Sequence, residues 1–385
     1  MTRFSFFLRL PVLLLLAHAY VAFRLLAAVR DPLLWWLGLT ALALLYALIL
    51  IGFTLRGRAG RRLSDAAAWI GFLALGGFSW LFVLTVLRDV ALLIVAGLGV
   101  FVPAVAGVVG RVAVMTAAAV PVLVLVAVLL GLFNARRKPR VQVVDIPIDG
   151  LPERLQGFTI VQISDLHVGP TIKHAYVQAV VDIANGLKPD LIALTGDLVD
   201  GDVEHLGRHV RPLAGLDARE GVYFVTGNHE YYCGAQQWIE AFRRLGFHVL
   251  VNEHRVVRRG EAGLVIAGVT DFGAAKFDAG QASSPSAAVR GAPSDAAVRI
   301  LLAHQPRSAD AALRAGFDLQ LSGHTHGGQF WPWQYFVPLQ QPFVAGLHRM
   351  DRLLVYVSRG TGYWGPPMRL GARSEITCLR LVNGS

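Results

Sequence analysis

Five short segments of the sequence carry residue types that bind metal ions. Aspartate, asparagine and histidine recur in them, in the patterns D-x-H, G-D, G-N-H-E, a lone histidine and G-H-T-H. A mixed set of imidazole, carboxylate and amide oxygen suits manganese, iron or zinc better than an all-thiolate zinc site or an oxygen-only calcium site. The candidate metal ligands are Asp165, His167, Asp197, Asn228, His304, His324 and His326.

Such a ligand set can hold two divalent ions. Ions about 3.5 to 4 Å apart can bridge a phosphate and a hydroxide, lower the pKa of the water and neutralise the developing charge. One carboxylate must bridge the pair, and Asp197 is the natural bridge because it stands alone between the other ligand clusters. The remaining ligands divide into one set per ion, Asp165, His167 and His326 for the first and Asn228, His304 and His324 for the second.

An α/β domain must position these side chains. Short β-branched runs alternate with amphipathic helical stretches, and the ligands come after strands whose ends meet at one rim in α/β folds. Alternate residues of D-x-H and H-x-H point the same way from an extended segment, so each pair can face one site. A helix is predicted at 175–187, and strands at 158–163, 191–195, 222–226, 264–269, 299–303, 353–357 and 375–381.

The first third of the chain differs from the rest. It holds apolar runs of about 20 residues, the length that crosses a bilayer core as a helix. The stretch 90–110 is split by Pro103 and rich in glycine, which leaves a fifth span, a continuation or a re-entrant piece open. We therefore predict a transmembrane helical region at 1–135 with about four spans, at 10–29, 33–55, 66–87 and 112–133.

Charge patterning sets the expected topology. The formal net charge is +10, but much of the excess is arginine beside apolar spans, so no nucleic-acid partner is expected. Four spans place both basic clusters in the cytoplasm, whereas five would export the second. This predicts a multi-pass protein of the cell (inner) membrane with a cytoplasmic catalytic domain. The clusters are Arg56, Arg58, Arg61 and Arg62, then Arg136, Arg137, Lys138 and Arg140.

A few polar residues interrupt these patterns without suggesting chemistry. His18, Arg24 and Arg88 lie in or beside the apolar runs and are expected to snorkel or to lie at the interface. Cys233 and Cys378 lack disulfide or zinc-knuckle spacing and are expected to be ordinary buried thiols.

Taken together, the ligand motifs resemble the calcineurin-like metallophosphoesterase superfamily. Its pattern D-x-H, G-D-x-x-D, G-N-H-E/D, H and G-H-x-H is matched in full within about 138–385, and G-H-T-H-G-G-Q at 323–329 resembles its membrane-associated bacterial branch. The resemblance implies a β-sandwich flanked by helices at 158–385, after a basic linker and entry strand at 136–157. It also implies two divalent metal ions, manganese first and iron or zinc as alternatives, on the seven ligands named above.

The resemblance further implies roles around the metal ions. Asn228 and His229 would contact the substrate phosphate, and His229 would stabilise or protonate the leaving group. Asp200 of G-D-x-x-D would orient that imidazole, with a solvated turn residue as the alternative. Arg359 would grip the phosphate, with a surface ion pair as the alternative.

These features predict a membrane-anchored, metal-dependent phosphoric ester hydrolase that cleaves a phosphodiester or pyrophosphate bond. An anchor near the active site favours a lipid-linked substrate, and one type of relative suggests UDP-2,3-diacylglucosamine. A broad-specificity phosphodiesterase and a non-catalytic membrane scaffold that retains the fold are the alternatives. The intact ligand set argues against the scaffold.

Two segments near the motifs have less definite signals. Residues 273–297 are rich in Ala, Ser, Gly and Pro, which predicts a mobile surface insertion, disordered or a lid. An aromatic cluster follows the last histidines and could hold acyl chains, touch the bilayer surface or pack in the ordinary way. Its members are Phe330, Trp331, Trp333, Tyr335, Phe336 and Phe343.

Overall fold

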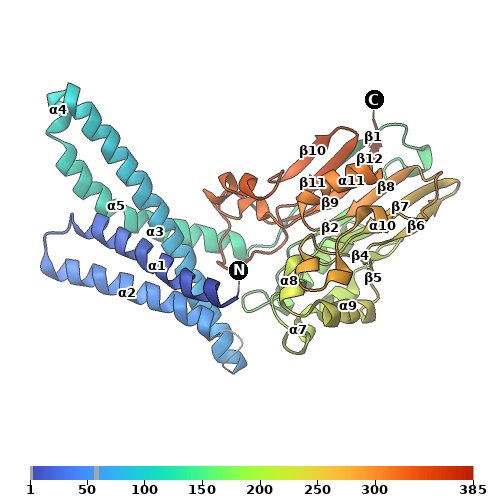
Figure 1. Cartoon of the computed structure of the whole chain (residues 1–385), viewed down its shortest axis with the longest axis horizontal. Helices are drawn as coiled ribbons and strands as arrows, with labels where there is room; N and C mark the ends of the chain where they lie inside the picture. The colour runs from blue at the N-terminus through green and yellow to red at the C-terminus, as the bar shows by residue number, and fades with distance from the viewer. Residues whose placement is uncertain (1–2, 56–59, 385) are drawn as a thin grey trace. The chain divides into compact units, whose positions relative to one another are not determined.

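The computed structural model describes residues 3–55 and 60–384, which divide into two compact units (Figure 1). The first unit runs to Phe133 and includes Gly365–Met368, and the second is built from Asn134–Trp364 and the chain from Arg369 onward. Arg56 and Arg58 of the first predicted basic cluster lie outside the described residues.

Long apolar helices build the first unit. Within the described residues, four of them are long and apolar enough to cross a membrane. The ambiguous stretch 90–110 extends the third of these helices to Phe101, and the helix breaks before Pro103, which cannot continue it. The stretch is therefore a continuation and not a fifth span. The helices are α1 (Arg3–Leu26), α2 (Pro32–Thr54), α3 (Arg61–Phe101), the short α4 (Pro103–Ala106) and α5 (Val109–Arg136).

The polar residues of these helices pair with one another. Arg24 Nε lies 2.6 Å and Arg88 Nη1 3.0 Å from the carboxylate of Asp89, and the Arg88 side chain is only 5% exposed. His18 is buried and stacks on Phe78 with ring centroids 3.6 Å apart. Snorkelling is therefore wrong for Arg88 and His18, because the Asp89 carboxylate and the buried Phe78 ring give them partners inside the bundle.

Two six-stranded sheets form the second unit. Residues of both sheets, Ile160 and Leu379 from one and Leu264, Ile300 and Leu321 from the other, meet in one fully buried core, as the predicted β-sandwich requires. The first sheet has the order β1 (Arg140–Ile148), β12 (Glu375–Asn383), β2 (Thr159–Ile163), β3 (Leu191–Leu194), β4 (Val222–Phe224), β5 (His248–Val249). The second has the order β10 (Gly346–Met350), β11 (Leu353–Val357), β9 (Leu319–Ser322), β8 (Val298–Leu302), β7 (Ala262–Gly268), β6 (Glu253–Arg259).

Helices flank the sandwich on both outer faces. Trp238 and Phe242 of one helix pack with strand residues of the first sheet in a second core, and a third core joins helical alanines to the second sheet. Figure 1 shows α7 and α9 along the sheet that holds β4 and β5. The first face carries α6 (His174–Gly186), α7 (Val203–Val210) and α9 (Ala235–Arg244), and the second carries α10 (Pro285–Ala288) and α11 (Ala309–Ala315).

All the strands predicted by residue range are present, with ends shifted by a few residues. The entry strand expected within 136–157 is β1. The strands that sequence patterns missed, β5, β6 and β10, lie at the edges of the sheets. Edge strands contact one neighbour and face solvent, so they need no continuous apolar run, and β6 reads E-H-R-V-V-R-R.

The segment 273–297 is not a structureless insertion. It forms short helical turns, η3 (Ala274–Lys276) and η4 (Ala279–Gln281), before α10, and Ala274 and Ala288 are fully buried. The Tyr231 hydroxyl donates to Gln281 Oε1 at 2.7 Å. Small side chains pack closely against neighbouring backbone, so the scarcity of large apolar groups does not prevent burial. The expectation of disorder is therefore wrong, whereas the expectation of a surface segment is confirmed, because most residues of 273–297 are exposed or partly exposed.

Candidate metal centre

Parallel strands from both sheets deliver the predicted ligands to one place. β2, β3 and β4 are parallel neighbours, and so are β8 and β9. Asp165 and His167 follow β2, Asp197 follows β3, and α8 (Asn228–Tyr232) follows β4. His304 follows β8, and His324 and His326 follow β9.

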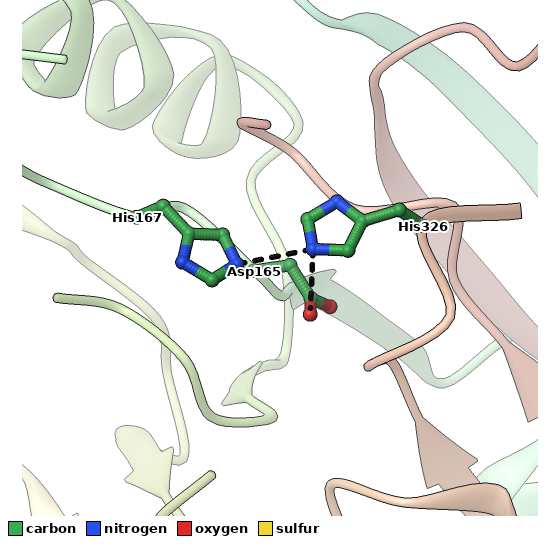
Figure 2. Close-up of side chains that lie close together, drawn as sticks. All are labelled: Asp165, His167 and His326. Atoms are coloured by element: carbon green, nitrogen blue, oxygen red, sulfur yellow. Dashed lines mark hydrogen bonds and ion pairs between the residues drawn. The ribbon is translucent and has the colours of Figure 1, made fainter. Parts of the chain in front are cut away.

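One group of ligands consists of Asp165, His167 and His326. The Nε2 atoms of the two histidines are 3.0 Å apart, and His326 Nε2 is 3.4 Å from Asp165 Oδ1. Figure 2 shows the carboxylate and both rings pointing toward one another. All three residues are buried, so their polar atoms face each other and not water.

A second group consists of Asp197, His304 and His324. His304 Nε2 lies 3.0 Å from Asp197 Oδ2 and 3.2 Å from His324 Nδ1. The Asp197 carboxylate also groups with His167 and His229, with ligand atoms all within 4.8 Å of one another. Asp197 thus lies between the two predicted ion positions, which is where a bridging carboxylate must be.

Five of the seven predicted ligands have a left-handed backbone conformation. Such φ values are uncommon for residues other than glycine and concentrate at functional sites. The D-x-H and H-x-H segments are therefore not extended, and the expectation that an extended segment aligns each pair is wrong. Left-handed turns after the strands aim the side chains instead. The φ values are 54° at Asp165, 51° at His167, 53° at Asp197, 69° at His324 and 52° at His326.

Glycines in the motifs let backbone N–H groups approach the carboxylates. A Cβ on Gly323 would lie 2.1 Å from Asp165 Oδ2, and the next residue's amide, that of His324, donates to Asp165 at 3.0 Å. A Cβ on Gly227 would lie 2.2 Å from Asp197 Oδ1. Only glycine leaves room for these carboxylates to keep their places.

Gly323→Ala is expected to lower metal affinity roughly 10–100-fold, because the added methyl displaces Asp165. Metal bound after dialysis, measured by inductively coupled plasma mass spectrometry, checks this. Gly207→Ala in α7 is the control, since its Cβ would meet nothing within 4 Å. Full metal retention in Gly323→Ala would contradict the packing described here.

Asp200 accepts from two histidine rings. Its Oδ1 lies 3.0 Å from His167 Nδ1 and 2.5 Å from His229 Nδ1. Asp200 is 8% exposed, so the solvated-turn alternative is wrong, whereas Asp202 is the exposed residue that caps α7. Sequence reasoning paired Asp200 with His229 but missed its contact with His167, since no local spacing signals it.

These contacts explain the charge state of His229. Burial raises the pKa of Asp200, but the His167 and His229 rings hold it well below its usual range. Burial lowers the pKa of His229, but the carboxylates of Asp197 and Asp200 raise it to about 9. The two carboxylates therefore shift the His229 pKa in the direction that favours the protonated imidazole.

Asp200→Asn is expected to lower kcat roughly 10–100-fold, because a neutral amide loses the negative charge that strengthens the hydrogen bonds to both imidazole rings. Steady-state kinetics with manganese check the effect, and Asp202→Asn, at an exposed carboxylate, is the control. Equal activity of the two variants would show that Asp200 does not orient the rings.

The donor set fits a metal ion. His304 Nδ1 lies 2.8 Å from the Thr195 carbonyl, which can only accept, so the ring donates there and its Nε2 is the atom that faces Asp197. Burial lowers the pKa of His304, but Asp197 raises it well above its usual value, which shows the demand for positive charge. Asn228 Oδ1 is buried with no hydrogen-bond partner. A divalent cation satisfies these acceptors together.

Two further residues hold the ligand loops. Glu230 is fully buried and accepts from the amides of Gly227, Asp197 and Leu198 at 2.7, 3.0 and 2.8 Å. Burial raises the pKa of Glu230 to about 7. Arg369 is 1% exposed and donates to the carbonyl of His326 at 2.9 Å. The fourth letter of G-N-H-E pointed to Glu230, whereas the sequence motifs gave Arg369 no role at the site.

Arg359 lies against a carboxylate and not among the ligands. Its Nη1 is 3.2 Å from Glu375 Oε2, and its side chain is 40% exposed. Arg359 is therefore placed in an ion pair, which was the predicted alternative to gripping the phosphate. The expectation about the cysteines is met in part, because both are free and Cys378 is buried, but Cys233 is only half-buried.

A sandwich with metal-ligand loops at the carboxyl ends of its strands defines the class of the metallophosphoesterases. The model of the family described as calcineurin-like phosphoesterase matches residues 158–328. The chain is 35% identical over 261 residues to an uncharacterized metallophosphoesterase of Aquifex aeolicus, covering 66% of this chain and 97% of that one. This chain therefore belongs to the calcineurin-like metallophosphoesterase family.

Other relatives share the membrane character. A transmembrane protein with metallophosphoesterase domain from Danio rerio is 40% identical over 269 residues, 67% of this chain and 61% of that one. The protein of that name from Bos taurus is 40% identical over 263 residues, 66% of this chain and 59% of that one. The chain thus matches about three fifths of the length of these curated relatives.

Proposed function

We propose that this protein is a membrane-anchored phosphoesterase with a dinuclear metal centre that hydrolyses a phosphodiester or pyrophosphate bond. The observation that carries the proposal is the position of Asp197. Its carboxylate groups with His304 and His324 on one side and with His167, a member of the other ligand group, on the other. Two ions at these positions supply Lewis-acid polarisation of the phosphate and neutralise its charge. Manganese is the proposed metal, with iron or zinc as alternatives.

The chain's own residues bind and orient the substrate. Asn228, whose amide oxygen has no hydrogen-bond partner, completes the second ligand set and faces the phosphate. His229 contacts the phosphate from its Nε2 side, because its Nδ1 is held by Asp200 at 2.5 Å. A proton at Nε2 is then in place for the departing oxygen, and general acids of this kind accelerate reactions about 10²–10⁴-fold.

We further propose a lipid-linked substrate, of which UDP-2,3-diacylglucosamine is the named candidate. The chain supports this by its connectivity, since α5 ends at Arg136 and β1 begins at Arg140. So short a tether keeps the hydrolase domain at the membrane. The motif at 323–329 supports membership of the membrane-associated bacterial branch, with an inner-membrane location and a cytoplasmic catalytic domain from the positive-inside rule.

Hydrolysis by detergent-purified full-length protein with manganese tests the proposal. UDP-2,3-diacylglucosamine is compared with bis(4-nitrophenyl) phosphate. A strong preference for the lipid supports the lipid-linked assignment, whereas turnover of both at similar rates favours the broad-specificity phosphodiesterase. No turnover of either by metal-loaded protein would contradict both and favour the scaffold alternative.

Topology has its own test. A reporter fused at the C-terminus and active in the cytoplasm supports four spans, because an even number returns the chain to the side where it began. A reporter active only outside the cytoplasm would overturn the four-span topology.

A further inference from the structure

Exposed aromatic side chains flank His229. The Tyr232 ring lies 5.2 Å from the His229 ring at an interplanar angle of 60°, and the Trp364 ring lies 5.9 Å away at 77°. Tyr232 is 61% exposed and Trp364 51%. Large apolar rings left open to solvent beside a reactive histidine are typical of a surface that a ligand covers.

The segment 273–297 adds a third ring to this group. Phe277 is 45% exposed, and its ring lies 5.8 Å from that of Tyr232. Contacts with α8 fix the position of Phe277. Its ring lies 5.7 Å from the Tyr231 ring, and the Tyr231 hydroxyl donates to Gln281 of the same segment. This segment therefore places a third aromatic ring beside α8.

The last residue of G-H-T-H-G-G-Q anchors Trp364. The Trp364 amide donates to Gln329 Oε1 at 2.8 Å, and Gln329 Nε2 donates to the Trp364 carbonyl at 2.9 Å. Gln329 is 7% exposed, so this pair of hydrogen bonds is shielded from water. The loop that supplies His324 and His326 to the metal centre thereby also sets the position of Trp364.

We propose that Tyr232, Phe277 and Trp364 form a subsite for a planar aromatic group on the leaving group of the substrate, and that Gln329 is a positioning residue for Trp364. The inference rests on the proposed function, in which His229 faces the departing oxygen. Edge-to-face and offset stacking favour an aromatic ring over a saturated group of the same size. A nucleoside base in the departing half of a nucleotide-containing lipid has this chemistry.

Binding of three phosphonates to the manganese-loaded full-length protein, measured by isothermal titration calorimetry, tests the subsite. Methylphosphonate reports on the phosphate site alone, benzylphosphonate adds a ring, and cyclohexylmethylphosphonate adds a saturated group of equal size. We expect benzylphosphonate to bind roughly tenfold more tightly than methylphosphonate. Cyclohexylmethylphosphonate is expected to bind several-fold more weakly than benzylphosphonate.

Variants assign the preference to residues. Tyr232→Ala and Trp364→Ala are expected to reduce the benzyl preference to about threefold or less while methylphosphonate affinity stays the same. Tyr335→Ala, at a tyrosine 69% exposed in η7 (Trp333–Tyr335), is the matched control and keeps the preference. Gln329→Ala is expected to lower the preference without further loss when combined with Trp364→Ala, the signature of action through that residue.

Several results would overturn the subsite. They are an unchanged benzyl preference in Tyr232→Ala and Trp364→Ala, equal binding of the benzyl and cyclohexylmethyl ligands, and no binding of any phosphonate. If an alanine variant loses methylphosphonate binding, Trp364→Phe and Tyr232→Leu replace it. The benzyl preference is expected to be retained in Trp364→Phe and lost in Tyr232→Leu.

Hydrolysis of bis(4-nitrophenyl) phosphate by the same samples separates the subsite from the proposed function. A benzyl preference without hydrolysis would contradict only the proposed hydrolysis. Hydrolysis without the benzyl preference would contradict only the proposed subsite.

Discussion

Asp197→Ala is expected to lower kcat/KM at least about 10³-fold, because it removes the carboxylate that belongs to the second ligand group and also lies beside His167 of the first. A large part of the electrostatic stabilisation is lost with it. Asp197 is 2% exposed and lies 3.0 Å from His304 Nε2, so its loss leaves that imidazole facing an apolar methyl group. Bound metal is expected to fall from about two ions per chain to one or fewer. Steady-state kinetics and inductively coupled plasma mass spectrometry measure the two effects.

A matched carboxylate separates this effect from a loss of negative charge alone. Asp145 on β1 pairs with Arg380 at 2.8 Å, and both side chains are about half exposed. Asp145→Ala is expected to keep both metal ions and full activity, since exposed ion pairs contribute little to stability. Full metal content in Asp197→Ala would show that Asp197 does not bridge the ions.

His229→Asn is expected to lower the rate about 10²–10⁴-fold for substrates with poor leaving groups, because the proton donor is lost. The loss should be smaller for bis(4-nitrophenyl) phosphate, whose leaving group departs without protonation. Metal content should stay at about two ions per chain, because the ligand groups are intact without His229. Comparison of kcat for the aryl ester and an alkyl ester measures the difference.

His205 provides the control for a histidine held by aspartate. Its ring lies 2.6 Å from Asp202, and its side chain is 47% exposed on α7. His205→Asn should leave both rates unchanged. An equal rate loss for aryl and alkyl esters in His229→Asn would show that His229 binds the phosphate without protonating the leaving group.

The candidate metal ligands could be predicted from the sequence because metal binding depends on the type of side chain. Carboxylate and imidazole side chains such as Asp165 and His304 follow buried apolar strands, and parallel strands end at one edge. The central strands were predictable for a related reason, since strands buried on both faces need continuous apolar residues, as in β7. The four long apolar helices follow from length and hydropathy alone.

Other features arise only when distant segments meet. The edge strand β6 has no apolar run to reveal it. Arg24 meets Asp89, and Arg88 meets the Ala113 carbonyl, only inside the helix bundle. Packing of residues 273–297 depends on small side chains such as Ala274 meeting the rest of the domain. Composition reports average polarity, and so it cannot report these individual contacts.

By itself, the sequence determined which donor atoms are present, their order along the chain and the apolar helices that precede them. The tertiary structure alone decided the left-handed backbone at the ligands, the sharing of Asp200 by two imidazoles and the position of Trp364 beside His229. The physical reason is that contacts across the sandwich impose these arrangements. Asp165 accepts from the His324 amide across 159 residues of chain, and no local pattern encodes that bond.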